Sequence, residues 1–263
     1  PGEARAGDGV VDVAPLEPAA ELEAGLVLGI HDYFAKQNLP PNAVVGLSGG
    51  IDSPVAAFQM MQRGCHVLFI HFHSFPLVEG TSREKAKDLV ALLTRYQFRS
   101  RLLLVPFSKA QQHIIVSVPP AYRVILYRRF MFRIAEALTL RHGGRALVTG
   151  ESLGQVSSQT LDNLTTIDAA AEQLITLRPL ISMHKESIVT QARQLGTYPI
   201  SIIPDQDCCS LFVPKHPATR SRRDDVAHLE SSLAVNEIVR EAVEATEEQL
   251  FRWPEDGKRS KAP

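Results

Sequence analysis

The amino-acid sequence predicts an α/β fold in which helices cover both faces of a parallel β-sheet, giving three layers. Short apolar runs of strand length alternate with segments of helical period along most of the chain. A glycine-rich turn separates the first of these runs from the helix that follows it. Strands that alternate with helices are joined by right-handed crossovers into parallel sheets. Ligands of such sheets bind outside the carboxyl ends of the strands, where we therefore expect the functional site.

The first part of the chain predicts a helix and then a strand–helix–strand unit. Apolar side chains recur at helical spacing over residues 22–34. After two consecutive prolines, residues 43–47 form a short apolar run that indicates a buried strand. A helix is expected over 54–63, because Pro54 is tolerated in a first helical turn. Residues 66–72 are again mostly apolar and indicate the second strand.

The same alternation continues through the middle of the chain. A helical period over 83–96 precedes an apolar run at 101–105. A long helical period over 121–141 precedes another apolar run at 145–148, and a further short strand is expected at 173–177. These runs add further strands and helices to the predicted parallel sheet.

The last third of the chain is less regular. Residues 184–195 have a helical period, whereas 197–223 are rich in proline and predict a long loop, of the kind that usually has a function. Residues 224–251 return to a helical period on an acidic background. The predicted organisation is a flexible linker, one α/β domain, an amphipathic helical extension and a solvated tail, at residues 1–20, 21–223, 224–251 and 252–263.

The composition excludes several classes of protein. Among the 263 residues, 44% are hydrophobic and 22% are charged, which argues against a disordered or fibrous chain. The net charge of −1 provides no overall basic field, so any contact with nucleic acid requires a local patch. Three cysteines are too few for a disulfide framework or a four-ligand zinc site. Without a membrane-spanning apolar run or a signal pattern, the expected location is the cytoplasm, with no membrane contact.

The strongest functional signal is the segment 48–53, which has the sequence SGGIDS and lies between a predicted strand and a predicted helix. Two glycines let the backbone approach a ligand closely, and consecutive N–H groups at a helix N-terminus form a site for an anion. Asp52 is placed to hold Mg²⁺ against phosphate oxygens. The GxxxxGK[ST] pattern of P-loop kinases does not occur in the sequence. The alternative is a tight strand-to-helix turn that needs glycine only for its geometry.

The SGGxDS pattern resembles that of the PP-loop ATP pyrophosphatases, which cleave ATP to AMP and pyrophosphate. Between Val44 and Arg223, longer segments resemble the catalytic domain of the tRNA 4-thiouridine synthetases, sulfurtransferases that are also tied to thiamine biosynthesis. The segments that carry this resemblance are LSGGIDSPVA (47–56), HFHS (71–74), LVTGESLGQVSSQTL (147–161), LRPLISMHKESI (177–188) and DCCSLFVPKHPATR (207–220).

The resemblance implies a set of ATP-binding residues and three catalytic residues. The implied ATP-binding residues are Gly46, Leu47, Ser48, Gly49, Gly50, Ile51, Asp52, Ser53, His71, Phe72, Arg128, Gly150 and Gln159. The implied catalytic residues are Asp52, Lys185 and Cys208. Lys185 is expected to neutralise charge that develops at the α-phosphate. Cys208 is expected to act as a nucleophile or persulfide carrier, with Cys209 as a substitute or resolving partner.

Each of these residues also has a structural interpretation. His71 and His73 alternate along a strand and so share one face, which would suit a metal pair, but the sequence offers no obvious third ligand. Arg128 and its neighbour Arg129 could form the solvated face of the long helix. Lys185 could be a surface lysine, although a cation near a helix N-terminus is unfavourable without a neighbouring anion. The Cys208–Cys209 pair could be two buried thiols, since adjacent cysteines form only a strained disulfide.

The function implied by the resemblance is ATP-dependent tRNA sulfur transfer. In this scheme the O4 atom of a tRNA uridine is adenylated by ATP with Mg²⁺. Sulfur from a persulfide, supplied by a cysteine desulfurase, then replaces the adenylate to give 4-thiouridine. Family members carry an N-terminal ferredoxin-like and THUMP region that docks tRNA, where this chain has the linker-like residues 1–20.

The partners implied by the resemblance are tRNA, a cysteine desulfurase and a second copy of the chain in a homodimer. The candidate contacts to the tRNA backbone are Lys215, Arg220, Arg222 and Arg223. A role in supplying sulfur for thiamine synthesis is a further implication. Two alternatives stay open: a PP-loop ligase or amidotransferase-type synthetase, which would not need Cys208, and a module that binds ATP or AMP without turnover.

Overall fold

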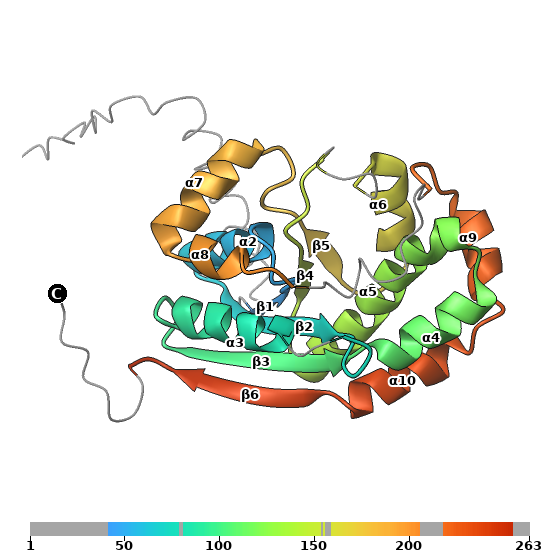
Figure 1. The fold of residues 1–263 in the computed structure, drawn as a ribbon, viewed down its shortest axis with the longest axis horizontal. Coiled ribbons are helices and arrows are strands. Elements are labelled where there is room, and N and C mark those ends of the chain that lie inside the picture. The colour runs from blue at the N-terminus through green and yellow to red at the C-terminus, as the bar shows by residue number, and fades with distance from the viewer. Residues whose placement is uncertain (1–41, 79–80, 154, 156–158, 206–217, 255–263) are drawn as a thin grey trace, which may run out of the picture.

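A six-stranded β-sheet organises the computed structural model, which describes residues 42–78, 81–153, 155, 159–205 and 218–254. The order of the strands across the sheet is β5-β4-β1-β2-β3-β6 (Figure 1). The first five strands are parallel to one another, and β6 runs antiparallel to β3. The strands are β1 (Asn42–Gly46), β2 (His66–His73), β3 (Arg99–Pro106), β4 (Ala146–Val148), β5 (Ile175–Leu177) and β6 (Glu247–Arg252).

Helices lie on both faces of this sheet and complete the predicted three layers. Helices α2, α3 and α7 contribute to one hydrophobic core, and α4, α5, α9 and α10 contribute to the other. The helices of the described residues are α2 (Asp52–Gln62), α3 (Thr81–Thr94), α4 (Ser108–Ser117), α5 (Arg123–Arg141), α6 (Leu161–Asp168), α7 (Lys185–Leu195), α8 (Tyr198–Ser201), α9 (Arg223–Glu230) and α10 (Val235–Glu244), with a short 3-10 turn at Pro120–Tyr122.

The strands supply both cores because successive side chains of a strand point to opposite faces. In β1, Val44 belongs to the core on the α5 side, whereas Ala43 and Val45 belong to the core on the α2 side. In β3, Leu103 and Leu104 divide between the two cores in the same way. This burial on both faces explains why the strands appear in the sequence as continuous apolar runs.

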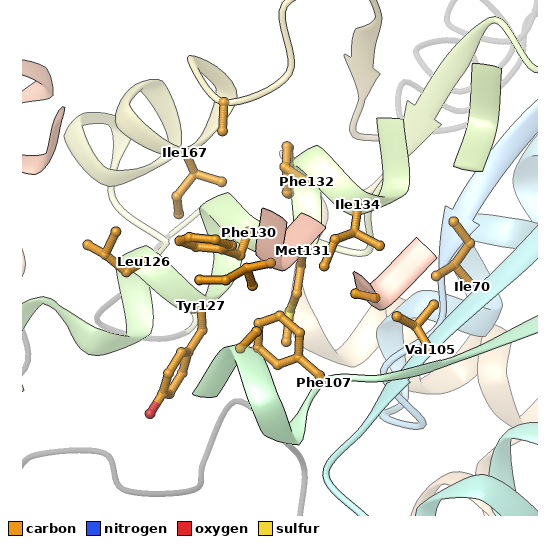
Figure 2. Close-up of a cluster of buried hydrophobic side chains, with 14 of the residues drawn as sticks. Ile70, Val105, Phe107, Leu126, Tyr127, Phe130, Met131, Phe132, Ile134 and Ile167 are labelled. Atoms are coloured by element: carbon orange, nitrogen blue, oxygen red, sulfur yellow. The ribbon is translucent and has the colours of Figure 1, made fainter. Parts of the chain in front are cut away.

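Helix α5 forms the centre of one core, and Figure 2 shows its apolar side chains gathered between α6 and the sheet. The rings of Phe107 and Tyr127 contact each other edge to face, with their centroids 6.1 Å apart. Phe72, at the end of β2, packs edge to face against Phe107 at 5.6 Å. Because α4, α6 and α10 all pack against α5, this helix buries side chains around most of its circumference.

The structure confirms the predicted strands and corrects the prediction for the C-terminal segment. The helical period expected over 224–251 ends at Glu244, and Glu247–Arg252 forms strand β6 instead. In β6 the half-buried Gln249 and Phe251 alternate with exposed residues, and Phe251 packs against the core on the α2 side. The free edge of β3 therefore selects an extended conformation over the helix that the local sequence favours.

Some predicted segments lie partly or wholly outside the described residues. These are the linker at 1–20, the helix expected at 22–34, and all of the tail at 252–263 beyond Pro254. Helices α4 and α6, which were not predicted from the sequence, both pack against α5. Among the described residues, no helix has both the length and the apolar character needed to span a membrane.

Candidate active site

A cavity of about 310 Å³ opens at the carboxyl ends of β1 and β4, where the parallel sheet predicts a ligand. Nine of the residues expected to bind ATP line it: Gly46, Leu47, Ser48, Asp52, Ser53, Phe72, Arg128, Gly150 and Gln159. The remaining lining is mostly apolar and comes from β1, β4 and α5: Val44, Val124, Met131, Phe132, Ala135, Leu147, Val148, Thr149 and Glu151. Gly49, Gly50, Ile51 and His71 are not among the lining residues.

The SGGIDS segment forms a tight loop that leads directly into α2. The N–H of Ser48 donates to Oγ of Ser53 at 3.1 Å, and the N–H of Gly50 donates to Oγ of Ser48 at 3.2 Å. Gly49 has a backbone φ of +81°, which residues with a Cβ atom rarely adopt. Since α2 begins at Asp52, the loop presents backbone N–H groups at a helix N-terminus, an arrangement that binds anions.

Asp52 and Lys185 lie side by side although 133 positions separate them in the sequence. Lys185 Nζ donates to Asp52 Oδ1 at 2.6 Å. Both are the first residues of helices, α2 and α7, and both side chains are partly exposed to solvent. A lysine is unfavourable at the positive end of a helix dipole, so the carboxylate offsets an electrostatic cost at this position.

Gly150 fits the loop after β4 closely against the start of α2. A Cβ atom at this position would lie 2.7 Å from the backbone nitrogen of Ser53 and 2.8 Å from the carbonyl carbon of Asp52. Real Cβ atoms do not approach backbone so closely, so only glycine lets these two loops meet. The contact therefore fixes the loop after β4 against the SGGIDS loop, and both line the cavity.

Glu151 is a site residue that the sequence analysis did not single out. It lines the cavity, is 4% exposed, and forms ion pairs with both Arg128 and Arg178. The hydroxyl of Thr149 also donates to Glu151 Oε2, at 2.9 Å. Glu151 and Arg178 both occur in the motifs that carry the family resemblance. They are 27 positions apart, however, and nothing in the sequence indicates that their side chains form a pair.

His71 is buried and contacts the residue that precedes the SGGIDS loop. Its side chain is 2% exposed, with Nδ1 2.8 Å from the carbonyl oxygen of Leu47 and Nε2 3.4 Å from Oγ of Ser82. His73, two residues further along β2, is also buried, and burial together with the charge of Arg83 lowers its pKa to about 4. The described residues contain no group of three His, Cys, Asp or Glu side chains that could hold a metal ion, so they offer no support for a metal pair.

A buried lysine holds the segment 201–205 against the loop, and this contact was also missed from the sequence. Lys85 Nζ donates to the carbonyl oxygen of Ile203 at 2.8 Å and lies 3.3 Å from Asp205 Oδ1. Ser201 Oγ donates to the carbonyl oxygen of Gly50 at 3.3 Å. The residues that follow, including Cys208, Cys209 and Lys215, lie outside the described part of the chain.

Arg128 and Arg129, consecutive residues of α5, have different surroundings. Arg128 lines the cavity, whereas Arg129 is buried on the α9 side. Arg129 donates from Nε and Nη2 to the two carboxylate oxygens of Glu230, at 3.0 and 2.7 Å. Arg129 therefore joins two helices rather than lining the site, which answers the question that the sequence left open. Of the basic residues proposed to contact RNA, Arg220, Arg222 and Arg223 are exposed near the start of α9.

Helices on both faces of a mostly parallel sheet, with the SGGIDS loop between its first strand and the next helix, place this chain among the α/β proteins of the PP-loop fold. Two solved synthetases show the same fold at low sequence identity. They are an NMN synthetase from Francisella tularensis (TM-score 0.55, 16% identity, 88% of this chain and 94% of that one) and an NAD+ synthetase from Burkholderia pseudomallei (TM-score 0.51, 17% identity, 89% and 90%). A family model described as "Thiamine biosynthesis protein (ThiI)" matches residues 41–235. The chain belongs to the ThiI family.

Curated relatives and a further solved structure agree with this family. A probable tRNA sulfurtransferase from Thermus thermophilus is 51% identical over 237 residues, which are 89% of this chain and 58% of the relative. One from Geobacillus kaustophilus is 43% identical over 227 residues, 85% of this chain and 56% of the relative. A 4-thiouridine synthetase solved with RNA and bound ATP is 40% identical, with a TM-score of 0.76 over 80% of this chain and 55% of that one. The chain thus spans little more than half the length of these relatives.

Proposed function

We propose that this chain is the ATP-using catalytic part of a tRNA sulfurtransferase that converts a uridine into 4-thiouridine. The observation that carries the proposal is the contact between Asp52 and Lys185 beside the SGGIDS loop, 2.6 Å between Oδ1 and Nζ. A turn that needs glycine only for its geometry would require neither group, whereas phosphoryl chemistry uses an ammonium group to offset charge and a carboxylate to hold a metal ion. The names of the curated relatives, and the 4-thiouridine synthetase solved with RNA and ATP, support the same activity.

ATP binds in this proposal with its pyrophosphate part over residues 48–53 and its nucleoside in the cavity. The backbone N–H groups of the loop and the N-terminus of α2 attract the phosphate charge. The adenosine occupies the apolar part of the lining, which includes Phe72, Met131 and Leu147. Arg128 and Gln159, which also line the cavity, supply polar contacts.

The first chemical step is adenylation of the tRNA base. The O4 atom of uridine attacks the α-phosphorus, the bond to the bridging oxygen breaks, and pyrophosphate leaves with the electron pair. Lys185 offsets the negative charge that develops on the α-phosphate oxygens, as a compact ammonium does well. The AMP now attached to O4 is a good leaving group for the step that follows.

Sulfur transfer is assigned to Cys208, with a persulfide supplied by a cysteine desulfurase. The terminal sulfur attacks C4 of the activated base, and AMP leaves. A second thiol, for which Cys209 is a candidate, then attacks Cys208 Sγ and breaks the remaining S–S bond, which releases 4-thiouridine and forms a disulfide. A thiol reductant must reopen this disulfide before the next turnover, and the strain of a bridge between adjacent cysteines favours that reduction. Covalent transfer of this kind divides a difficult substitution into easier steps.

The residues present fit a magnesium ion that arrives with ATP. Mg²⁺ in nucleotide sites takes one or two carboxylates and completes its shell with phosphate oxygens and water, so a cluster of protein ligands is not needed. Asp52, which lines the cavity beside the loop, is the carboxylate that would hold it. When bound, the ion supplies charge neutralisation on the phosphates. Lys185 supplies the second positive charge from this chain.

Further parts of the proposal concern partners and cell biology. The tRNA substrate approaches the exposed arginines at positions 220, 222 and 223, which provide the local basic patch that the net charge of −1 does not. We also propose that the chain acts in the cytoplasm as a homodimer, and that the activity can supply sulfur for thiamine synthesis. The family description supports the last of these roles.

The test is a reaction of the chain with unmodified tRNA, ATP·Mg²⁺ and a persulfide donor, followed by digestion and mass analysis for 4-thiouridine. We expect product with the unaltered chain, about 10²-fold less with Asp52→Asn or Lys185→Met, and none with Cys208→Ser. Asp88→Asn, an exposed carboxylate change on α3, is the matched control and should leave the rate unchanged. Release of pyrophosphate is measured in the same tubes to separate the two steps.

The two readouts separate this function from the alternatives. Pyrophosphate release that requires ammonia and not tRNA, with no 4-thiouridine even when the persulfide donor is present, would indicate a ligase or amidotransferase-type synthetase instead. Binding of ATP with no pyrophosphate release under any condition would indicate a module without turnover. Normal 4-thiouridine formation by Cys208→Ser would remove the role assigned to that cysteine.

A further inference from the structure

A carboxylate buried in the wall of the cavity is held by two arginines that come from different elements. Glu151 follows Gly150 in the loop after β4, and its side chain is 5% exposed. Oε2 accepts hydrogen bonds from Arg178 Nε at 2.6 Å and from the hydroxyl of Thr149 at 2.9 Å. Oε1 forms the ion pair with the Arg128 guanidinium of α5. One carboxylate therefore links the loop after β4 to two cationic side chains.

Arg178 is itself fixed by a second carboxylate. Its Nη1 and Nη2 donate to the two oxygens of Asp168, at 2.9 and 2.5 Å, in a forked pair that strongly restrains the guanidinium plane. Asp168 is the last residue of α6, and Arg178 directly follows β5. Charges of alternating sign thus run in the order Asp168, Arg178, Glu151, Arg128, from the end of α6 to the cavity.

We propose that Glu151 is the residue that positions Arg128 for ATP, and that Arg178 with Asp168 braces it. This inference rests on the proposed binding of ATP in the cavity. A guanidinium carries five N–H donors, so it can contact a carboxylate and a ligand oxygen at the same time. Without an anchoring anion, a long arginine side chain loses conformational freedom when it orders against a ligand, and that cost weakens binding. Glu151 removes the cost before ATP arrives.

The same fold contains a matched carboxylate that does not face the cavity. Glu230 of α9 is 5% exposed and accepts hydrogen bonds from Arg129 and Arg133 of α5, as Glu151 pairs with Arg128 and Arg178. The two carboxylates are equally buried, and each is held by two arginines, yet only Glu151 lines the cavity. A comparison of the two separates an effect on ATP from the general cost of breaking a buried ion pair.

The experiment measures the dissociation constant of ATP·Mg²⁺ by calorimetry for Glu151→Gln and Glu230→Gln, each at a temperature where circular dichroism shows it folded. Glutamine preserves shape and removes the charge. We expect Glu151→Gln to weaken ATP binding about tenfold, and Glu230→Gln to lower the melting temperature with the affinity unchanged. Asp168 lies outside the cavity, and Asp168→Asn should weaken ATP binding about threefold. This variant replaces Glu151→Gln in the test if Glu151→Gln does not fold.

A double-mutant cycle tests whether Glu151 acts through Arg128. If it does, adding Glu151→Gln to Arg128→Met weakens ATP binding no further. The dissociation constants of the Arg128→Met single variant and of the double variant should then agree within about twofold. Equal weakening in both backgrounds would overturn the positioning role, as would unchanged affinity in Glu151→Gln. Failure of the unaltered chain to bind ATP would overturn the proposed function, and this inference with it. If the unaltered chain binds ATP but the Glu151→Gln result is not as expected, only the positioning role fails.

Discussion

At the scale of single residues, the site depends on side chains whose identity is fixed by close contacts. Gly150 meets the backbone of Ser53, Asp52 meets Lys185, and His71 supports the carbonyl oxygen of Leu47. Each contact places a group at the boundary between the SGGIDS loop and a neighbouring element. The geometry of the loop is therefore a property of its surroundings as well as of its own glycines.

The space around Gly150 leads to a prediction about stability. Gly150→Ala would place a methyl group 2.7 Å from the backbone nitrogen of Ser53, and backbone cannot move aside as a flexible side chain can. We expect the free energy of unfolding to fall by about 1–3 kcal/mol. Gly46→Ala is the matched control, because a Cβ there meets nothing within 4 Å. Urea denaturation of both variants checks this, and equal stability of the two would contradict it.

At the scale of elements, α5 and the strands around it decide which helices can dock. Its consecutive arginines face two different neighbours, the cavity and α9. Burial alone would raise the pKa of Glu230, but hydrogen bonds and charges from Arg129 and Arg133 outweigh burial and lower it. The carboxylate is therefore ionised at neutral pH and attaches α9 to the core helix.

The docking of α9 can be tested through that carboxylate. In Glu230→Gln the two arginines lose a buried counter-charge, so we expect the free energy of unfolding to fall by about 3 kcal/mol. Hydrogen exchange in Arg223–Glu230 should rise more than exchange in β1. Glu244→Gln, an exposed change on α10, should alter stability by less than about 0.5 kcal/mol. A loss no larger than this control's would show that the pair does not hold α9.

At the scale of the whole molecule, the antiparallel strand β6 closes one edge of the parallel sheet (Figure 1). Its first residue, Glu247, pairs with Arg83 of α3, and both lie near the buried His73 of β2. Neither ring nitrogen of His73 has a hydrogen-bond partner among the described residues. Strand β6, which is distant in the sequence, thus joins β2 and α3 around a histidine whose neutral form is favoured.

This enclosed histidine predicts how the stability of the whole chain depends on pH. Burial, Arg83 and His71 lower the pKa of His73 from 6.5 to about 4, while Glu247 opposes the shift. Between these values the unfolded chain binds a proton that the folded chain refuses, so stability falls as the pH falls from 6.5 to 4, by at most about 3 kcal/mol. The contribution is constant above this range.

The measurement is urea denaturation between pH 4 and pH 7 for the unaltered chain, His73→Leu and His66→Gln. Leucine has a similar volume and cannot be protonated, so the fall in stability across this range should be smaller in His73→Leu. His66 is exposed at the start of β2, and its replacement should leave the pH dependence as it was. If the free energy of unfolding depends on pH in the same way in all three proteins, the protonation of His73 does not contribute to that dependence.

Local patterns in the sequence determined much of this protein. Burial on both faces makes β1 to β4 largely apolar runs, so these strands were visible without any tertiary information, whereas β5 lies at a sheet edge and is exposed or half-buried. Glycine and hydroxyl residues at fixed offsets between a strand and a helix predicted the loop at 48–53. The strands and this loop depend on residues only a few positions apart, so their pattern can be recognised in the sequence alone.

Contacts between distant segments were decided only by the tertiary structure. The edge of β3 made Glu247–Arg252 a strand where the sequence favoured a helix. The fold brought Lys185 to Asp52 across 133 positions and enclosed Glu151 between Arg128 and Arg178. Hydrophobic periodicity records which face of an element is buried but not which charged side chain faces it. The pairing of charges at the site therefore follows from packing.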